Sequence, residues 1–595
     1  MNNKTRDNEF DIFSLKDNEG EDKVTSLEKA VAAHIMPGMN IYIAPEGGAA
    51  ICQLIRQFWG TSPAFDLTIV GTTEHALNLV QCGLLKKLIT TNCSHIYPTP
   101  GLSRIIQDSY KEKKIEIENW TLYSHLQRLM AGALGVGFLS TKSVIDSDMA
   151  EENRDSFLVM DDPFGGVGKV GLVKALNPDI AIIHGWAADP HGNTISVPIS
   201  SQVQTDHKMW GAKASKNGVI VTVEKIVSTD FIRKYPALVT LPGYLVKSVC
   251  HVPFGAHPQG MLSPIAGLFD SYAPDYEFVA EHRLACQKPS EIESWIKKWV
   301  LDCKNQEEYI NRLGGGRINL IKEKANEDYW KKNYNDIIDK ATTDRVPNEI
   351  EIMIMTAARK VAEIMRKNNY RILLGGLGAG MLASWVAYYQ LRQRNYDIDL
   401  IVGSGSFGFA PRPGDSFYGT YSNMHSCKAF FDTADTYGYI LSGNNKRSLS
   451  ILGAAQIDKY GNINSTKMGN NYLLGSGGAN DAINASEVLI VVKQSRQRFI
   501  NKVPYVTCPG RNVKTLVSDM GIFEKVDDSR EFKLTACLPD TEGTGLKERI
   551  RRIKDNCGWE LKLATEVKES PMPDQEDFLT MRLFDPERLV IGDGA

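Results

Sequence analysis

A glycine-rich segment in the last quarter of the chain has the composition of a loop that holds negative charge. It reads Leu-Gly-Ser-Gly-Gly-Ala-Asn-Asp over residues 474–481, so three of the four positions 475–478 are glycine. Glycine tolerates positive φ and leaves backbone N–H groups exposed, and a row of such groups can hold an anion or a developing oxyanion. A tight turn ahead of the helical pattern at 481–489 is the alternative that the local sequence leaves open.

Two further glycine clusters, at 375–380 and 403–408, suggest a dinucleotide-binding loop but lack its pattern. The first reads GGLGAG, whose spacing is G-G-x-G-x-G instead of G-x-G-x-x-G. The next apolar run, IDLIVG at 398–403, also ends without the acidic residue that binds a ribose hydroxyl. We therefore expect no dinucleotide cofactor.

Residues able to move protons follow apolar runs in the first half. Glu46 lies in a Pro-Glu-Gly-Gly turn after the run at 39–43, and Glu74 and His75 follow the run at 65–71. Carboxylate and imidazole groups serve as general acids and bases, and the imidazole pKa lies near neutrality. Each of these residues also has a structural alternative, which for Glu46 is a carboxylate at the N-terminus of the next helix.

The cysteines and histidines lack the spacing of a metal site. The ten cysteines are scattered without C-x-x-C pairs, and the eleven histidines include no H-E-x-x-H pattern. We expect reduced, mostly buried thiols and no catalytic metal.

The elements that must position these residues alternate between strand and helix in both halves. Residues 39–58 and 371–391 each read as an apolar run, a glycine turn and an apolar helix, and further strand-like runs follow at 65–71 and 398–403. Strands alternating with helices form parallel sheets of the α/β class, whose sites lie beyond the carboxyl ends of the strands. The sequence therefore predicts an α/β fold with its chemistry at the strand ends.

A weak internal repeat relates the two halves. Residues 179–195 (DIAIIHGWAADPHGNTI) and 449–466 (LSILGAAQIDKYGNINST) share an apolar strand, an aspartate, an aromatic or imidazole ring, Gly-Asn and β-branched residues. The repeat predicts two pseudo-equivalent domains that face each other across a cleft.

A charged stretch divides the 595-residue chain into these domains. We expect a polar tail at 1–26, one domain at 27–320, a charged linker at 321–347 and a second domain at 348–595. Asn348 and Glu351 form a capping-box pattern at the start of a helix.

The composition bears on the partners and the location of the protein. A formal net charge of -3 favours neither a nucleic acid nor a membrane partner, and the N-terminal residues lack the apolar core of a signal peptide. No segment has the roughly 18 apolar residues of a membrane helix. We expect a cytoplasmic enzyme.

Several long motifs resemble one known family, the family I coenzyme A (CoA) transferases. The second half is similar to the β subunit of glutaconate CoA-transferase through AAQIDKYGNINST (454–466), GSGGAND (475–481) and QSRQRFINKVPYVTCPG (494–510). The first half resembles the α subunit through residues 118–143, 179–193, 253–258 and 299–317.

The resemblance implies a fused pair of subunits. Each half would be an open α/β domain of the CoA-transferase type, with the active site in the cleft between them and coenzyme A entering only as part of the thioester substrate. In the family the glycine loop and the preceding turn help to hold the acyl-CoA. The residues that inherit this role are Gln456, Gly475, Ser476, Gly477, Gly478, Ala479 and Asn480.

The family nucleophile is missing from this chain. In the family a glutamate in a V-E-S-G strand end attacks the thioester and forms covalent intermediates. The matching segment here reads Ile-Val-Gly-Ser-Gly over 401–405, which places Gly403 at the glutamate position and Ser404 beside it. No acidic residue lies between Asp399 and Asp415, so simple transferase chemistry lacks its carboxylate.

The resemblance adds two acid or base candidates in the first half. Glu46 stands where the family usually has glycines, and we take it as the counterpart of the missing glutamate across the repeat. His95, in TNCSHIYPTPG at 91–101, falls on a turn that faces substrate in the family. Glu74 and His75 remain candidates beside them.

Three hypotheses of function follow. The leading one is an acyl-CoA enzyme that decarboxylates its substrate or cleaves a carbon–carbon bond hydrolytically, with charge on the thioester oxygen stabilised by the cleft. The second is a true CoA transferase that uses another carboxylate such as Glu46, and the third is a noncatalytic acyl-CoA-binding protein. An acyl carrier protein thioester is an alternative substrate, and the fused unit is expected to form a homo-oligomer.

Overall fold

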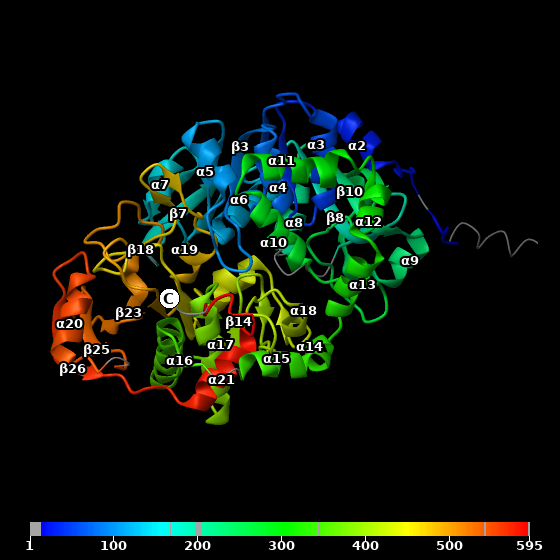
Figure 1. The fold of residues 1–595 in the computed structure, drawn as a ribbon. Coiled ribbons are helices and arrows are strands. Elements are labelled where there is room, and N and C mark those ends of the chain that lie inside the picture. Colours follow the sequence, from blue (N-terminus) through cyan, green and yellow to red (C-terminus); the bar gives the residue numbers. More distant parts are fainter. Residues whose placement is uncertain are drawn as a thin grey trace, which may run out of the picture.

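The computed structural model describes residues 14–18, 20–166, 168–196, 205–342, 345–526, 528–540 and 543–592. Figure 1 shows the first half of the chain, blue through green, lying against the second half, green through red. No helix in these ranges is long and apolar enough to cross a membrane.

The first half is built on a sheet whose central strands are all parallel. In spatial order they are β4 (Glu116–Asn119), β3 (Leu85–Thr90), β2 (Phe65–Thr68), β1 (Asn40–Ile43), β8 (Ile180–Ala188), β10 (Val219–Ile226) and β12 (Val246–His251). Alternate side chains of β1 enter different cores, Ile41 and Ile43 on one face and Tyr42 on the other. The sheet is thus buried on both faces, which explains its continuous apolar runs.

Helices pack against both faces of this sheet. Helices α2 (Leu27–His34), α3 (Gly48–Phe58), α4 (Glu74–Gln81) and α5 (Arg104–Lys111) pack side by side, whereas α6 (Leu122–Leu134) packs with α8 (Thr205–Ala214), which contacts β1 and β8. A small antiparallel sheet of β5 (Phe138–Thr141), β7 (Lys169–Lys174) and β6 (Phe157–Asp161) adjoins α6.

The second half repeats this arrangement. Its parallel strands are, in order, β14 (Asp399–Ile401), β13 (Ile372–Gly375), β17 (Ser448–Leu452), β22 (Glu487–Val491) and β23 (Val513–Val517). Antiparallel β15 (Ser406–Phe407) and β16 (Ala429–Phe430) extend one edge, and β24 (Gly521–Glu524), β25 (Lys533–Cys537) and β26 (Lys562–Glu569) extend the other. Helices α16 (Glu349–Lys367) and α17 (Ala379–Gln393) lie side by side below it in Figure 1. The predicted α/β class is confirmed.

The predicted internal repeat is a real structural match. Asp189 Oδ1 accepts hydrogen bonds from the backbone of His191 and Asn193, and Asp458 Oδ1 accepts the same pair from Tyr460 and Asn462. In each turn the glycine before the asparagine has positive φ, 97° at Gly192 and 80° at Gly461. Each aspartate thus folds a Gly-Asn turn directly after a strand, β8 or the short β18 (Gln456–Ile457), in the same way.

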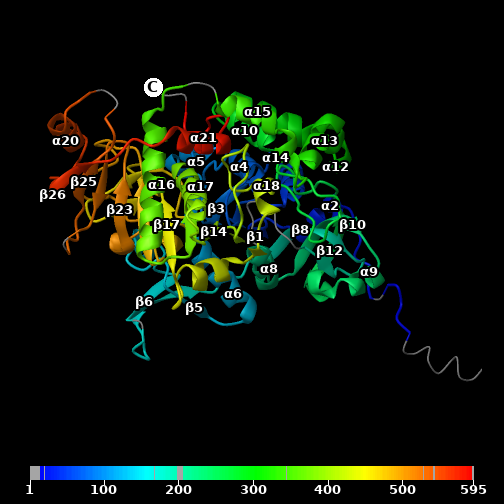
Figure 2. The same ribbon diagram turned by 90° about the horizontal axis from the view of Figure 1, so that it is seen from below.

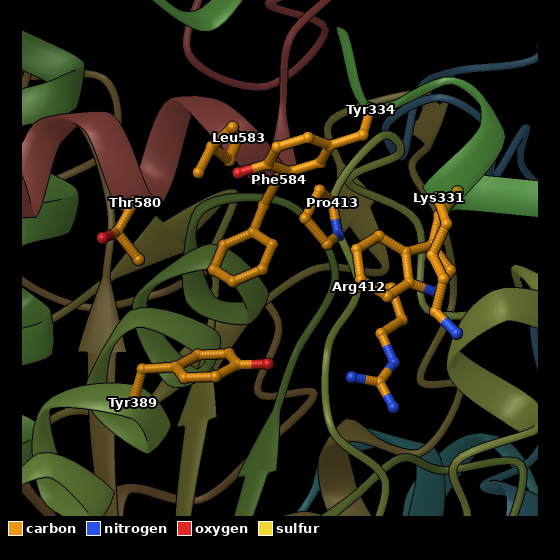
Figure 3. A pocket seen from close by; sticks show the side chains of 9 residues that line it. Lys331, Tyr334, Tyr389, Arg412, Pro413, Thr580, Leu583 and Phe584 are labelled. Atoms are coloured by element: carbon orange, nitrogen blue, oxygen red, sulfur yellow. The ribbon is translucent and has the colours of Figure 1, made fainter. Parts of the chain in front are cut away.

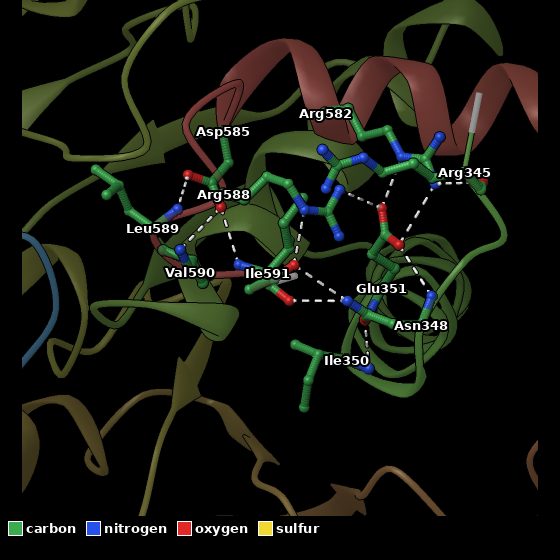
Figure 4. Close-up of polar contacts among 11 residues, drawn as sticks. Arg345, Asn348, Ile350, Glu351, Arg582, Asp585, Arg588, Leu589, Val590 and Ile591 are labelled. Carbon is green, nitrogen blue, oxygen red and sulfur yellow. Dashed lines mark hydrogen bonds and ion pairs between the residues drawn. The ribbon is translucent and has the colours of Figure 1, made fainter. Parts of the chain in front are cut away.

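The capping box predicted at Asn348 and Glu351 begins α16 and also holds the C-terminal helix. Asn348 Oδ1 accepts from the Glu351 amide at 2.9 Å, and Glu351 Oε2 accepts from the Asn348 amide at 2.9 Å. Arg582, on α21 (Gln575–Phe584), donates from Nε to Glu351 Oε1 at 2.7 Å, as Figure 4 shows. The buried carboxylate therefore joins the two ends of the second half.

The predicted linker is largely helical. It contains α14 (Tyr329–Lys332) and α15 (Tyr334–Ala341), and α15 lies beside α21 in Figures 1 and 2. The first part of the predicted tail, residues 1–13, lies outside the described residues, whereas Thr25 donates from its amide to Val249 O of β12 at 2.9 Å. The three boundaries between the four predicted segments stay predictions.

Candidate functional site

A cavity of about 570 Å³ lies between the two halves. The first half contributes residues after β2 and β3, and the second contributes the ends of β13, β14, β17 and β22 with the glycine loop. Because the strands of each sheet are parallel, their carboxyl ends meet at one edge. The cavity therefore lies where the sequence predicted the site.

Two strand ends with the same three residues line this cavity. Ile69-Val70-Gly71 follows β2, and Ile401-Val402-Gly403 begins at the last residue of β14. Val70, Gly71, Val402 and Gly403 are all lining residues. Strand β2 pairs with β1 as β14 pairs with β13. Gly71 is therefore the counterpart of Gly403 in the repeat, which corrects the assignment of Glu46 to that place.

The glycine loop joins the two halves. The amide of Gly477 donates to Thr91 O at 2.8 Å, that of Leu122 donates to Gly477 O at 3.0 Å, and that of Cys93 donates to Leu474 O at 2.9 Å. The amides of Gly475 and Ser476 donate to Ser465 O and Asn119 Oδ1. Much of the predicted anion cradle is thus occupied by protein acceptors, although Gly475, Ser476, Gly477, Gly478 and Ala479 do line the cavity.

Asn480 and Gln456 are anchored within the protein and are not lining residues. Asn480 Oδ1 accepts from the Val144 amide at 2.7 Å, and its Nδ2 donates to Thr507 O at 2.8 Å. The Gln456 amide donates to Gln497 O at 3.2 Å and accepts from Asn464 at 2.9 Å. The neighbours Ala454 and Ala455 line the cavity instead, so these two amides position the backbone around it.

Glu46 is buried in an ion pair. It is 1% exposed, and Lys208 Nζ, also 1% exposed, lies 3.2 Å from Glu46 Oε1 and donates further to the carbonyl oxygens of His184 and Ser196. Its other oxygen, Oε2, has no partner in the described structure. Pro45 is a lining residue whereas Glu46 is not. The structure thus places this carboxylate behind the cavity wall.

Glu74 begins α4, next to the lining residue Thr73. Burial raises the pKa of Glu74 to about 7, against the effect of hydrogen bonds that include one from Gln259 Nε2 at 3.4 Å. Such a carboxyl is half protonated near neutrality, which suits proton transfer. Its side chain is not among the cavity-lining residues.

The two histidine candidates are core residues. His75 packs against Phe278 and Trp295, and burial lowers its pKa to about 3. Burial lowers the pKa of His95 to about 4, with the charge of Arg283 adding to the effect. Both rings are therefore neutral at physiological pH, and neither is a lining residue.

Tyr437 is a lining residue that the sequence analysis missed. It lies on a π-helical turn, η5 (Ala434–Ile440), and a Cβ added at Gly403 or at Gly478 would overlap its hydroxyl oxygen. The hydroxyl thus occupies the space beside Gly403, the predicted position of the family glutamate. No local pattern marks this tyrosine, because only the tertiary structure brings it to Gly403.

Three buried polar atoms of lining residues have no hydrogen-bond partner among the described residues. They are Thr72 Oγ1, Asn92 Oδ1 and Ser476 Oγ. Buried polar atoms are nearly always satisfied, so unsatisfied ones in a cavity mark groups available to a ligand. Lys493 and Arg498, both exposed, add positive charge to the lining. The residues that line the cavity thus include two hydroxyl groups and one side-chain amide that are buried, and two cations that are exposed.

A second pocket, of about 550 Å³, contains none of the predicted site residues. Figure 3 shows its aromatic lining, which comes from α14, α15, α17 and α21. Among the described residues no three His, Cys, Asp or Glu side chains gather as a metal site.

Comparison with known proteins identifies the family. The model of the coenzyme A transferase family matches residues 24–251 and 354–541. Subunits A and B of glutaconate CoA-transferase from Acidaminococcus fermentans are 27% and 26% identical over 331 and 250 residues, which are 50% and 38% of this chain and 94% and 87% of those subunits.

Two further relatives extend the comparison. An uncharacterized protein of Archaeoglobus fulgidus is 29% identical over 51% of this chain, and the match spans 64% of that protein's length. The crystal structure of an acyl-CoA transferase from Escherichia coli O157:H7 superposes with a TM-score of 0.62 at 16% identity, covering 94% of this chain and 96% of that one. Since both halves match the family model, this chain belongs to the coenzyme A transferase family, with regions like its A and B subunits fused in one polypeptide.

Proposed function

We propose that this family member acts on an acyl-CoA thioester without forming a glutamyl intermediate, and that it decarboxylates its substrate. One observation carries the proposal: Gly403 stands at the predicted nucleophile position, and the Tyr437 hydroxyl fills the space that a side chain would need there. Glycine offers no carboxylate to attack a thioester. The cavity is thus built to exclude the family nucleophile.

The polar lining fits a reaction that places charge on a thioester oxygen. When a carboxylate on the carbon next to an enoyl thioester leaves as carbon dioxide, the electron pair of the broken bond moves through the double bond onto that oxygen. Hydroxyl donors in a cavity shielded from water stabilise such charge strongly. Thr72 and Ser476 carry hydroxyl oxygens that no group of the described residues engages. Hydrolytic carbon–carbon cleavage shares this requirement but also needs an activated water.

The exposed cations support coenzyme A as the carrier of the acyl group. Lys493 and Arg498 line the same cavity as the glycine loop. Coenzyme A carries phosphates, and arginine and lysine are the usual partners of phosphate oxygens. This arrangement lets the nucleotide stay near the surface while the thioester enters the cavity.

Carbon dioxide release from glutaconyl-CoA tests the proposal. We expect release from glutaconyl-CoA and none from glutaryl-CoA, because the saturated chain cannot delocalise the electron pair onto the thioester. The same preparations are incubated with labelled acetate and then treated with borohydride. Release without label exchange, and without borohydride inactivation, supports the proposal.

The other outcomes point to the alternatives. Label exchange with inactivation by borohydride contradicts the proposal and favours a transferase that uses a carboxylate such as Glu46. In that case Glu46→Gln abolishes exchange. Glutaconyl-CoA hydrolysed without release of carbon dioxide indicates a hydrolase. Tight binding with none of these reactions indicates a noncatalytic binding protein.

A further inference from the structure

The Tyr437 side chain is enclosed by both halves of the chain. Its hydroxyl oxygen lies beside Gly403 at the strand end and Gly478 in the glycine loop. Leu122 of the first half borders the same space, since its Cδ1 would lie 3.1 Å from a Cβ at Gly478. Tyr437 is only 4% exposed, and it is one of the residues that line the cavity. Two glycines and one leucine thus hold one hydroxyl at the cavity wall.

The surroundings keep this hydroxyl protonated. Burial raises the pKa of Tyr437 well above its usual range, and the charge of Asp481 adds to this effect. Asp481 is itself fixed, because its carboxylate accepts hydrogen bonds from the Tyr123 amide at 3.0 Å and from Ser143 Oγ at 2.5 Å. A neutral phenol acts as a hydrogen-bond donor throughout the physiological pH range.

The neighbouring Ser476 supplies a second hydroxyl. Ser476 lies two residues before Gly478 in the loop, is 4% exposed, and its Oγ has no partner in the described structure. Both residues line the cavity. One hydroxyl thus belongs to the glycine loop and the other is packed against it, and hydroxyl donors of this kind can stabilise a charged oxygen atom.

We propose that Tyr437 is a catalytic residue, whose hydroxyl donates a hydrogen bond to the thioester oxygen of bound acyl-CoA where the family nucleophile would otherwise stand. The assignment deepens the proposed function and rests on it for the identity of the substrate. Ser476 is the second donor to the same oxygen.

The reaction step balances with groups that are present. In glutaconyl-CoA the bond between the terminal carboxylate and its neighbouring carbon breaks, and carbon dioxide leaves. The electron pair moves through the carbon–carbon double bond and onto the thioester oxygen, where the Tyr437 and Ser476 hydroxyls stabilise it. A proton from solvent then adds to carbon, which regenerates a neutral butenoyl-CoA. Tyr437 keeps its proton throughout.

Tyr437→Phe is the direct test, with Tyr439→Phe as the matched control. Tyr439 lies on the same π-helical turn but is 56% exposed. We expect Tyr437→Phe to lower kcat for glutaconyl-CoA roughly 100- to 1000-fold, the usual effect of losing one oxyanion donor. Tyr439→Phe should retain wild-type kcat. Equal kcat in Tyr437→Phe and wild type overturns the assignment.

A spectroscopic readout keeps the test independent of turnover. Glutaryl-CoA labelled with carbon-13 at the thioester carbonyl is bound to each variant, and the infrared carbonyl stretch is recorded. We expect a shift to lower frequency in the wild type and in Tyr439→Phe, and loss of most of that shift in Tyr437→Phe. The dissociation constant of Tyr437→Phe should stay within about threefold of wild type.

The two measurements separate the two proposals. A wild type that shows the carbonyl shift but releases no carbon dioxide retains the Tyr437 donor and contradicts decarboxylation. A wild type that releases carbon dioxide, with the carbonyl shift unchanged in Tyr437→Phe, retains decarboxylation and overturns the Tyr437 assignment. Failure of the wild type to bind glutaryl-CoA overturns both.

Discussion

The strand ends after β2 and β14 have the same sequence, Ile-Val-Gly, yet the chain leaves them in different ways. After Gly71 it enters α4, where Thr73 Oγ1 accepts from the Ala76 amide at 3.3 Å. After Gly403 it turns back sharply, because Gly405 has φ 92° and its amide donates to Val402 O at 2.9 Å. The next residues form β15, antiparallel to β14.

This difference shows how equivalent backbone positions acquire different surroundings. The glycine after β2 faces the Asn92 amide, whose Nδ2 would lie 3.0 Å from a Cβ at Gly71. The glycine after β14 faces the Tyr437 hydroxyl, which leaves no room for a Cβ at all. The same tripeptide thus borders a movable side chain in one half and a fixed hydroxyl in the other.

Gly403→Ala should have the largest effect. Its Cβ overlaps the Tyr437 oxygen, and such overpacking typically costs about 1–3 kcal/mol of the free energy of unfolding. Urea denaturation measures the loss. The double variant Gly403→Ala with Tyr437→Phe, which removes the overlapping oxygen, should recover most of it. Wild-type stability in Gly403→Ala would mean that the overlap does not exist in solution.

Glu74→Gln should change how stability depends on pH. Because the pKa of Glu74 is raised to about 7 in the folded chain, the native state keeps a proton that the unfolded state loses near pH 4.5. This group's contribution to the free energy of unfolding therefore declines as pH rises from 4.5 to 7, by up to about 3 kcal/mol. Relative to wild type, Glu74→Gln should be more stable at pH 8 than at pH 4.5.

The matched control for that experiment is Glu28→Gln. Glu28 also lies in the first turn of a helix, α2, but is exposed. Its variant measures what replacing a first-turn carboxylate by an amide does to stability at the same two pH values. Parallel profiles for wild type and Glu74→Gln would contradict the raised pKa of Glu74.

Thr72→Val separates stability from activity at the first strand end. Within the described part of the chain the Thr72 hydroxyl is buried without a partner, so replacing it by a methyl group should stabilise the free protein by up to about 1 kcal/mol. If the hydroxyl binds substrate, kcat/KM for glutaconyl-CoA falls by about tenfold in the same variant. Lower thermal stability would show that the hydroxyl is satisfied in solution.

Gly71→Ala should have the smallest effect. The Asn92 side chain needs to shift by only a few tenths of an ångström to admit the new Cβ, so we expect a loss below about 1 kcal/mol. Urea denaturation of Gly71→Ala and of Gly403→Ala under the same conditions checks the comparison directly. A loss as large as that of Gly403→Ala would remove the contrast between the two strand ends.

Much of the framework around these strand ends follows from local patterns. The Asp189 and Asp458 turns, the capping box at Asn348, and the strand–glycine–helix units all depend on neighbours within a few residues. Whether an acid or base candidate reaches the cavity depends instead on the direction of its side chain. His75 and His95 follow strands as expected, but their rings pack into the core. Position after a strand does not decide which way a side chain points.

The sequence by itself determined the α/β class, the repeat, the family and the absence of an acidic residue at Gly403, because these depend on residue types and their spacing. Only the tertiary structure decided what fills the vacant position. Glu46 forms an ion pair with Lys208, and the Tyr437 hydroxyl lies beside Gly403. The backbone amides of Gly475 and Gly477 donate hydrogen bonds to other protein groups. These contacts join segments far apart in the chain, so close packing fixes them and local patterns do not.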